Sequence, residues 1–325
     1  RMADGFMGMF DNFFRNSKKS STYKPVFLRA LLDIADLHDP NKSEGMAGRD
    51  WLCRVGDRLR LDLNFIAIRY AKYYWDMEES FHLRQTQDPH GARIVHIIRE
   101  QTSTWKRRAP PGISQLESGG MESFRKKVIG QAIKPEVLYH LRTDMPNLYE
   151  KVDTNVIELD YGLVGFLHEH KTVIRQGLNG VIAKYLEKLN RMTPQIANKI
   201  DAERISRKPL SLRFKEQMHK SQKSRCFYCE CRLERTHVDH VIPFNYVFST
   251  DPYNCILACP RCNCLKHDRL PLRSIFGGVL DRNQDMTFMG RGIMPYNKRS
   301  YKQLFNACRQ EYNGTKKPFI PERCG

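Results

Sequence analysis

The sequence predicts an α+β protein that is mainly helical, with a helical N-terminal region followed by a smaller domain that a metal staples together. Two observations carry this prediction. Apolar residues recur at intervals of three and four through much of the first 200 residues, and that spacing is typical of amphipathic helices. Seven of the ten cysteines lie between Cys226 and Cys264, and such clustering indicates a metal site rather than a framework of disulfides.

Three stretches of the N-terminal region carry the helical pattern most clearly. Residues 24–37 and residues 61–77 each predict one amphipathic helix, the first of them behind an early proline. Residues 161–190 predict one long helix or two. Residues 105–120 instead combine a basic cluster, a Pro-Pro-Gly turn and a Gly-Gly pair, which predicts a loop.

A basic and polar stretch, residues 204–225, marks the expected boundary between domains. Such a charge run fits a solvated helix face or linker as well as a surface that tracks phosphates, and its position directly before the cysteine cluster favours the surface. We expect a mainly helical domain over residues 1–200, a metal-stapled domain over 201–275, and a C-terminal extension over 276–325 that packs on it. The extension should contain a helix over residues 300–312.

The net charge is the unusual feature of the composition. The chain carries +18 with an isoelectric point near 9.5, which favours a polyanionic partner because each neutralised phosphate releases condensed counterions. Nucleic acid is the first choice and an anionic membrane surface the second. The N-terminal residues form no apolar signal core and no apolar run approaches transmembrane length, so we expect a cytoplasmic protein.

Two C-x-x-C units, Cys226 with Cys229 and Cys259 with Cys262, predict a structural zinc site. Four thiolates close a tetrahedron around Zn²⁺ and leave no open position for water or substrate. Chance clustering is the alternative, but free cysteines rarely recur in paired C-x-x-C spacing. Three further cysteines lie next to expected ligands and could substitute for them: Cys231, Cys255 and Cys264. Surplus cysteines are more often small buried apolar side chains.

A short strand is predicted between the two cysteine pairs, over the run His-Val-Asp-His-Val-Ile-Pro. Its Val and Ile residues suit a strand, and Pro243 ends the pairing. Asp239 and His240 are neighbours, so a regular strand would send them to opposite faces. Both can serve one site only if the strand twists or ends there. Taken alone, a histidine in a strand is more often structural than catalytic.

The whole pattern is more specific than the pair. After D-H-V-I-P come Asn254 and then C-x-x-C-N-x-x-K-x-D, which supplies Asn263, Lys266 and Asp268. This order of residues resembles the HNH endonuclease family, in a four-cysteine zinc variant that has Asn at the third signature position. The resemblance covers residues 226–268. One departure is the loop from Phe244 to Thr250, which is aromatic and contains no glycine.

The resemblance implies a ββα-metal unit of two strands and a helix, bracketed by the zinc ligands. It implies that His240 is the general base, that Asp239 and Asn263 bind a catalytic Mg²⁺ or Mn²⁺ ion, and that Asn254 holds the active-site loop and the histidine. These residue types suit the chemistry. A neutral imidazole with a pKa near ~6.5 accepts a proton from water, and a hard cation prefers oxygen ligands.

DNA is the partner that the resemblance implies. We expect Lys266 to contact phosphate, although it could equally well be a lysine on the helix surface without a role in binding. The basic run should add further phosphate contacts. The expected DNA-binding residues are Lys266, Arg225, Lys223 and Lys220. His237 could support the site or simply occupy the strand, and we favour the second interpretation.

Two other segments, YKPVFLRALLDIAD and YLEKLNRMTPQIANKI, resemble segments of larger HNH proteins of bacterial restriction and phage defence. That resemblance implies that residues 1–200 select the target, form a homodimer or restrain the nuclease, with a partner protein of a defence system as a further option. Two other functions remain open. A zinc-stabilised DNA-binding module without catalysis explains the charge and the cysteines, but leaves Asp239, His240, Asn254 and Asn263 without a role. An RNA-cutting HNH-like toxin has no short motif that would distinguish it.

Overall fold

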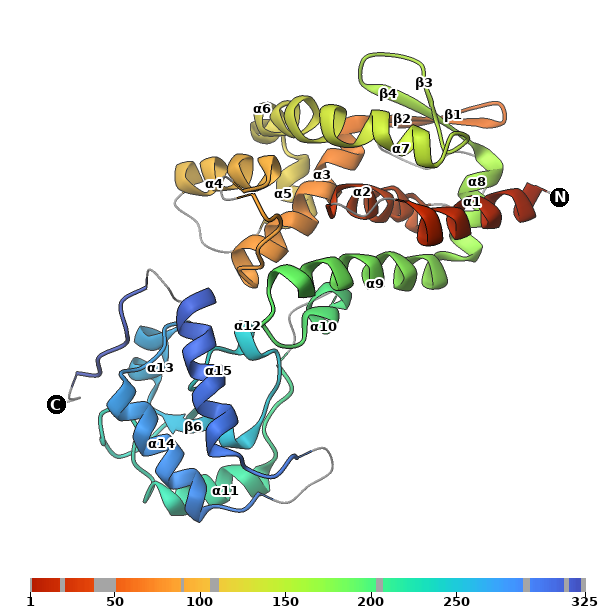
Figure 1. Cartoon of the computed structure of the whole chain (residues 1–325). Helices are drawn as coiled ribbons and strands as arrows, with labels where there is room; N and C mark the ends of the chain where they lie inside the picture. Colours follow the sequence, from red (N-terminus) through yellow and green to blue (C-terminus); the bar gives the residue numbers. More distant parts are fainter. Residues whose placement is uncertain are drawn as a thin grey trace. The chain divides into compact units, whose positions relative to one another are not determined.

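A computed structural model describes residues 2–17, 21–37, 51–88, 91–105, 111–202, 207–288, 293–312 and 316–322. The chain divides into two compact units, Arg1–Leu189 and Asn190–Gly325 (Figure 1). Helices dominate both units and small antiparallel sheets accompany them, so the prediction of a mainly helical α+β protein is confirmed. The roles expected for residues 1–200, 201–275 and 276–325 stay predictions.

The first unit is built around α2 (Tyr23–Leu32), which packs against α3 (Leu63–Trp75) and α9 (Lys171–Leu189). Eight of its ten residues are buried, so this helix forms the centre of the core. The helix predicted over residues 24–37 is thus present, extended by a 3₁₀ turn, η1 (Asp33–Asp36). Residues 161–190 form two helices, α8 (Tyr161–Glu169) and α9, with His170 between them.

The other helices of the first unit surround this core. They are α1 (Met2–Asn16), η2 (Asp76–Ser80), α4 (Arg93–Trp105), α5 (Ile113–Glu117), η3 (Gly119–Met121), α6 (Glu122–Val128), η4 (Ile129–Leu138) and α7 (Tyr139–Asp144). The loop predicted over residues 105–120 is therefore wrong at α5, where Leu116 is buried and anchors a short helix. Part of that stretch, residues 106–110, lies outside the described residues.

A four-stranded antiparallel sheet completes the first unit, in the order β1–β2–β4–β3. Its strands are β1 (Leu52–Val55), β2 (Arg58–Asp62), β3 (Glu150–Lys151) and β4 (Val156–Asp160). The helix predicted from residue 61 begins only at Leu63, because Asp62 ends β2 and caps α3 by accepting a hydrogen bond from the Asn64 backbone N–H at 2.8 Å. Leu59 and Leu61 alternate with exposed or half-buried polar residues and are buried, as a half-buried strand requires.

The second unit contains the predicted strand. Its elements are α10 (Ile196–Asp201), α11 (Leu212–Ser221), β5 (His237–His240), α12 (Phe244–Val247), η5 (Pro252–Asn254), β6 (Cys255–Ala258), α13 (Pro260–Lys266), α14 (Arg273–Asp285) and α15 (Lys298–Glu311). Strands β5 and β6 pair antiparallel, with Asp239 opposite Ile256 and His240 opposite Cys255. Helix α13 follows β6 directly and contacts β5, so the second unit has a ββα order.

The core of the second unit joins the cysteine region to the C-terminal helices. Phe276 of α14 stacks on Phe305 of α15 with ring centroids 4.0 Å apart, and both rings share a buried cluster with Val241 and Ile256. The helix predicted over residues 300–312 is present as α15. No helix in the described ranges is long and apolar enough to cross a membrane.

Candidate active site and zinc centre

The four predicted zinc ligands come together in the second unit. The sulfurs of Cys226, Cys229, Cys259 and Cys262 all lie within 4.8 Å of one another. A tetrahedral ion with Zn–S bonds of about 2.3 Å has S···S edges of about 3.8 Å, and the Sγ atoms of Cys229 and Cys259 are 3.8 Å apart. The donors therefore fit a structural Zn²⁺ ion, which would fasten the segment before β5 to the start of α13.

Local structure explains why the second cysteine pair converges. Cys259 is the N-cap of α13, and its Sγ accepts a hydrogen bond from the Cys262 backbone N–H at 3.4 Å. Pro260 occupies the first turn of the helix, where its missing N–H costs nothing. The N-terminal turn of α13 thus holds two thiols on one side, and its free N–H groups favour thiolate charge.

The three surplus cysteines have separate positions. Cys255 is fully buried in β6, in agreement with its interpretation as a small apolar side chain. Cys264 is exposed on α13, which differs from that interpretation. Cys231 is half-buried and packs against the core beside the zinc ligands. The metal-ligating group found among the described residues consists of the two C-x-x-C pairs alone.

His240 ends β5 and is almost entirely buried, with 6% of its surface exposed. Neither ring nitrogen has a hydrogen-bond partner among the described residues. The ring meets Phe244 edge to face, with centroids 5.2 Å apart. Burial lowers the pKa of His240 to about 3, and the positive charges of Arg207 and Lys266 add to the effect. The imidazole is therefore neutral at physiological pH, with a pKa well below the ~6.5 of an exposed histidine.

Asn254 holds the chain directly after His240. Its side-chain Oδ1 accepts a hydrogen bond from the Ile242 backbone N–H at 2.9 Å, and its Nδ2 donates to the Ile242 carbonyl at 2.8 Å. Its own carbonyl accepts from the Val241 N–H at 2.8 Å. Asn254 is 3% exposed, so these bonds are shielded from water and the backbone next to His240 is held firmly.

Asp239 lies in a second buried cluster. Its carboxylate accepts a hydrogen bond from the Tyr228 hydroxyl at 2.5 Å and pairs with the Lys266 ammonium at 3.0 Å. Lys266 is 0% exposed and also donates to the His240 carbonyl at 2.7 Å. The expectation that Lys266 contacts DNA phosphate is therefore wrong for this structure, because a buried ammonium with two partners cannot reach a phosphate. Lys266 lies three residues after Asn263, about one turn of α13, and is on the face of this helix that packs against β5.

Asn263 and His237 form the exposed end of the same cluster. The Asn263 amide Nδ2 lies 3.1 Å from the His237 Nδ1. His237 and Asp239 are two residues apart on β5 and share a face, while Asn263 and Lys266 are three apart on α13. Asp239 and Asn263 thus lie at one strand–helix interface, and a carboxylate and an amide are the kinds of oxygen donor that Mg²⁺ prefers. A divalent ion there would share the Asp239 carboxylate with Lys266.

Three residues of this region were not identified from the sequence as part of the site. Tyr228 buries its hydroxyl on Asp239, and no short pattern marks such a tyrosine. Arg207 lies over the Phe244 ring, 5.3 Å from its centroid, in a stretch read only as a charge run. His237 was interpreted as a strand residue, although the two-residue period of a strand already places it beside Asp239.

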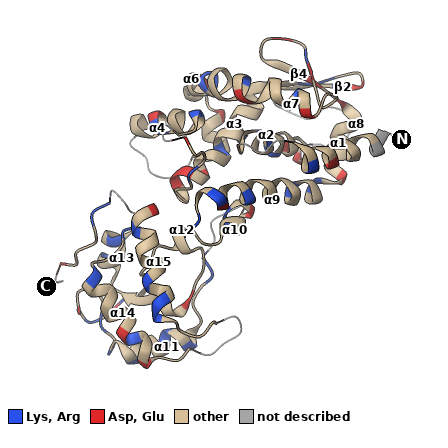
Figure 2. Ribbon diagram, in the orientation of Figure 1, with Lys and Arg blue, Asp and Glu red and all other residues tan. Residues whose placement is uncertain are grey.

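Positive charge is concentrated in the second unit. Residues 190–325 contain 25 Lys and Arg against 12 Asp and Glu, which is +13 of the chain's +18. Figure 2 shows Lys and Arg on helices throughout this unit. Of the expected DNA-binding residues, Lys220 and Lys223 are exposed. Arg225 is also exposed, and its guanidinium donates to the Glu230 carbonyl at 2.9 Å.

Comparison with known proteins agrees with this geometry. Residues 226–269 match the HNH endonuclease family model, and residues 9–141 match a domain family of unknown function, DUF8808. Neither a curated protein nor a solved structure matches the chain. Residues 226–269 are thus an HNH endonuclease domain in its four-cysteine zinc variant, and we call them the HNH unit. The predicted family is confirmed for this part of the chain.

Proposed function

We propose that the protein is a metal-dependent endonuclease that hydrolyses phosphodiester bonds in DNA, with His240 as the general base. One observation carries the proposal. In the HNH unit, a buried imidazole whose two nitrogens have no hydrogen-bond partner among the described residues directly follows Asp239 in β5. A buried polar side chain without hydrogen-bond partners lowers the stability of the fold, so its presence calls for a functional explanation. A neutral histidine can take a proton from an attacking water.

Each residue of the site has a distinct role in this proposal. His240 accepts the proton of the water that attacks the phosphorus. Asn254 fixes the backbone that carries His240, because its amide closes two hydrogen bonds with Ile242. Asp239 and Asn263 are the oxygen ligands of a Mg²⁺ or Mn²⁺ ion, which when bound stabilises the negative charge that develops on the phosphate.

Lys266 is a positioning residue in this proposal. Its ammonium bridges the Asp239 carboxylate and the His240 carbonyl, so it links the metal ligand to the backbone of the base. Tyr228 donates a hydrogen bond to the same carboxylate oxygen, Oδ2. With two donors already on Asp239, the orientation of the carboxylate is fixed before a metal arrives, which lowers the cost of binding it.

DNA is the proposed substrate because of the charge of the second unit. An excess of +13 on 136 residues supplies the sequence-independent attraction to phosphate that nuclease substrates share. Lys220 and Lys223 are the proposed phosphate contacts beside the HNH unit. A setting in bacterial restriction or phage defence, inside the cell and with residues 1–200 acting in target selection, dimerisation or restraint, follows from the resemblance stated above.

The test is cleavage of supercoiled plasmid by the full-length protein with added Mg²⁺. We expect nicked circles from the wild type, none after chelation of Mg²⁺, and a loss of about 100-fold or more in rate for His240→Ala. His219→Ala is the matched control, because His219 lies on α11 outside the HNH unit. Full cleavage by His240→Ala would overturn the assignment of the base.

The same experiment separates the other functions. If the wild-type protein binds plasmid but does not cut it with any divalent metal offered, the result favours a zinc-stabilised DNA-binding module. Cleavage of total RNA with an intact plasmid would favour an RNA-cutting toxin. Both results would contradict the proposal.

A further inference from the structure

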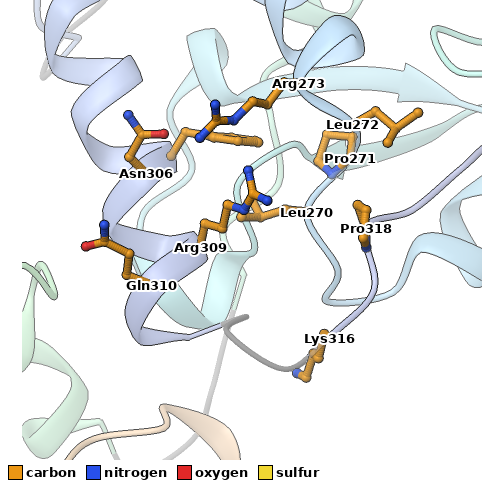
Figure 3. A pocket seen from close by; sticks show the side chains of 10 residues that line it. Leu270, Pro271, Leu272, Arg273, Asn306, Arg309, Gln310, Lys316 and Pro318 are labelled. Atoms are coloured by element: carbon orange, nitrogen blue, oxygen red, sulfur yellow. The ribbon is translucent and has the colours of Figure 1, made fainter.

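We propose that a pocket in the C-terminal part of the second unit binds a nucleoside phosphate. The pocket has a volume of about 820 Å³ and lies between the chain after α13, the start of α14, helix α15 and the segment around Pro318 (Figure 3). Ligand-binding clefts typically measure about 300–1,000 Å³. The lining residues lie between α13 and α14, at the start of α14 and in the C-terminal extension, and they do not include His240, Asp239 or the zinc ligands.

The floor of the pocket is apolar. Leu270 and Phe305 are 4% and 3% exposed, and Pro271, Leu272 and Pro318 complete the apolar lining. The Phe305 ring is held in place by its stack on Phe276. A rigid apolar floor of this kind offers van der Waals contact to a flat organic group such as a nucleobase.

Two arginines supply the charge. Arg273 and Arg309 come from different helices, and Figure 3 shows both guanidinium groups pointing into the pocket. Among the residues that the structure describes, neither guanidinium has a hydrogen-bond or carboxylate partner. Guanidinium groups bind phosphate oxygens in pairs of hydrogen bonds, so two convergent and unoccupied ones favour a phosphate over a neutral ligand.

The backbone adds to this preference. Arg273 is the first residue of α14, a helix of 13 residues with no acidic side chain in its first turn. The free N–H groups of that turn carry partial positive charge. Leu272 and Arg273 both line the pocket, so the helix start and the two guanidinium groups favour an anion at the same place.

The third cation of the pocket is already neutralised. Lys316 pairs with the Asp268 carboxylate at 2.5 Å. Burial alone would raise the pKa of Asp268, but the hydrogen bonds from Lys316 and His267 hold it at about 2. Lys316 and Asp268 therefore stay ionised and paired with each other. Lys316 forms part of the pocket wall, and Arg273 and Arg309 are the cations available to bind the negative charge of the ligand. The amides of Asn306 and Gln310 on α15 offer polar contacts to the organic part.

Two sources of this chemistry exist, a free nucleotide and a nucleotide of a DNA strand. Isothermal titration of the full-length protein, without added divalent metal so that cleavage does not enter, separates them. The probes are AMP, GMP, CMP and TMP, inorganic phosphate, and a short single-stranded oligodeoxynucleotide. We expect a nucleotide probe to bind more tightly than inorganic phosphate, since phosphate alone does not use the apolar floor.

Matched variants locate the binding. Arg309→Gln and Arg273→Gln should each weaken the bound nucleotide probe about tenfold or more. Arg299→Gln, which removes the same charge from an exposed position of α15 outside the pocket, should leave its affinity unchanged. Thermal unfolding checks that each variant is folded. A mononucleotide that meets these criteria identifies a free nucleotide as the source, whereas arginine dependence for the oligonucleotide alone identifies the strand.

The proposal is overturned if no nucleotide or oligonucleotide binds. It is also overturned if the double variant of Arg273 and Arg309 binds as tightly as the wild type, or if Arg299→Gln weakens binding equally. Because the measurement involves neither His240 nor a catalytic metal, it can fail while plasmid cleavage succeeds, and the reverse.

Discussion

The His240 ring is almost entirely buried, yet neither of its nitrogens has a hydrogen-bond partner in the part of the chain that the structure describes. Its pKa of about 3 means that the folded chain keeps the ring neutral where an unfolded chain would protonate it. The unfolded state therefore binds more protons between about pH 6.5 and pH 3. Stability contributed by this group is fully present above about pH 6.5 and is lost as the pH falls toward 3.

This sign leads to a measurable slope. Below about pH 5.5, where a histidine of the unfolded chain is almost fully protonated, the wild type should lose stability relative to His240→Phe by about 1.4 kcal/mol per pH unit, one proton's worth of linkage. Phe is suitable because it keeps the ring volume and cannot titrate. Urea unfolding of both proteins, loaded with zinc and without added Mg²⁺, gives the difference. Equal slopes for the two proteins would show that His240 is exposed and titrates normally.

The buried pair of Lys266 and Asp239 gives a second prediction. Lys266→Met keeps most of the side-chain volume but leaves the Asp239 carboxylate with Tyr228 as its remaining donor. Removing one partner of a buried ion pair costs about 3–5 kcal/mol, so the free energy of unfolding should fall by that amount. Lys302→Met, at an exposed position of α15, should change it by less than about 0.5 kcal/mol. A Lys266→Met protein as stable as the control would mean that Lys266 is not buried.

At this scale, the sequence could predict residue types but not their surroundings. The spacing of C-x-x-C pairs predicted the zinc ligands, because thiol chemistry leaves few alternatives. It could not predict that Lys266 turns inward, since a lysine three residues after Asn263 looks the same on either face of a helix until the strand beside it is known. Tyr228 was missed because no short pattern predicts its contact with Asp239, 11 residues further on, whereas the strand period already placed His237 on the face of Asp239.

Among the elements, α13 combines two functions. Its first turn presents Cys259 and Cys262 to the zinc site, and its next turns present Asn263 and Lys266 to β5. The zinc ion therefore positions the helix that carries one proposed metal ligand and the partner of the other. Loss of zinc should disturb the proposed catalytic site even though the zinc has no open coordination position.

Cys259→Ser tests this coupling. We expect the variant to lose its zinc, to unfold at a lower temperature and to cut plasmid poorly even with excess Mg²⁺. Cys264→Ser, which changes an exposed cysteine of the same helix, should keep about one zinc per chain and its activity. Elemental analysis, thermal unfolding and plasmid cleavage give the three readouts. Zinc retained at wild-type level in Cys259→Ser would show that the four-cysteine assignment is wrong.

Helices were easier to predict than strands in this chain. α2, α9 and α15 each present a long periodic pattern of apolar residues, whereas β1 and β2 contain four and five residues and display only one or two alternations. The strand β2 also runs directly into α3 at Asp62, so its last apolar residue, Leu61, looked like the first residue of the helix. Short strands depend on their partners, and β4, the partner of β2, lies about a hundred residues away along the chain.

On the scale of the whole molecule, the uneven charge predicts how DNA binding depends on salt. A second unit with +13 of the total +18 should make the affinity for duplex DNA fall steeply as salt rises. Changing Lys220 and Lys223 together to Gln should reduce the slope of log K against log salt by about 1.8, two phosphate contacts' worth. The same change at Lys126 and Lys127, which lie in the first unit, should leave the slope unchanged. Fluorescence anisotropy at several salt concentrations measures it, and identical slopes for all three proteins would place the DNA elsewhere.

Phe319 packs against the proposed catalytic site, although it is translated only after the whole HNH unit. Its ring is buried and meets Tyr228 edge to face, with centroids 5.1 Å apart, and its N–H is bonded to the Leu270 carbonyl. Tyr228 in turn holds Asp239. Before Phe319 has been translated, the nascent chain already contains every residue of the HNH unit. The Phe319 ring, however, does not yet pack on Tyr228. We expect the site to mature only once that phenylalanine has left the exit tunnel, so that truncated translation products carry the signature residues without a finished nuclease.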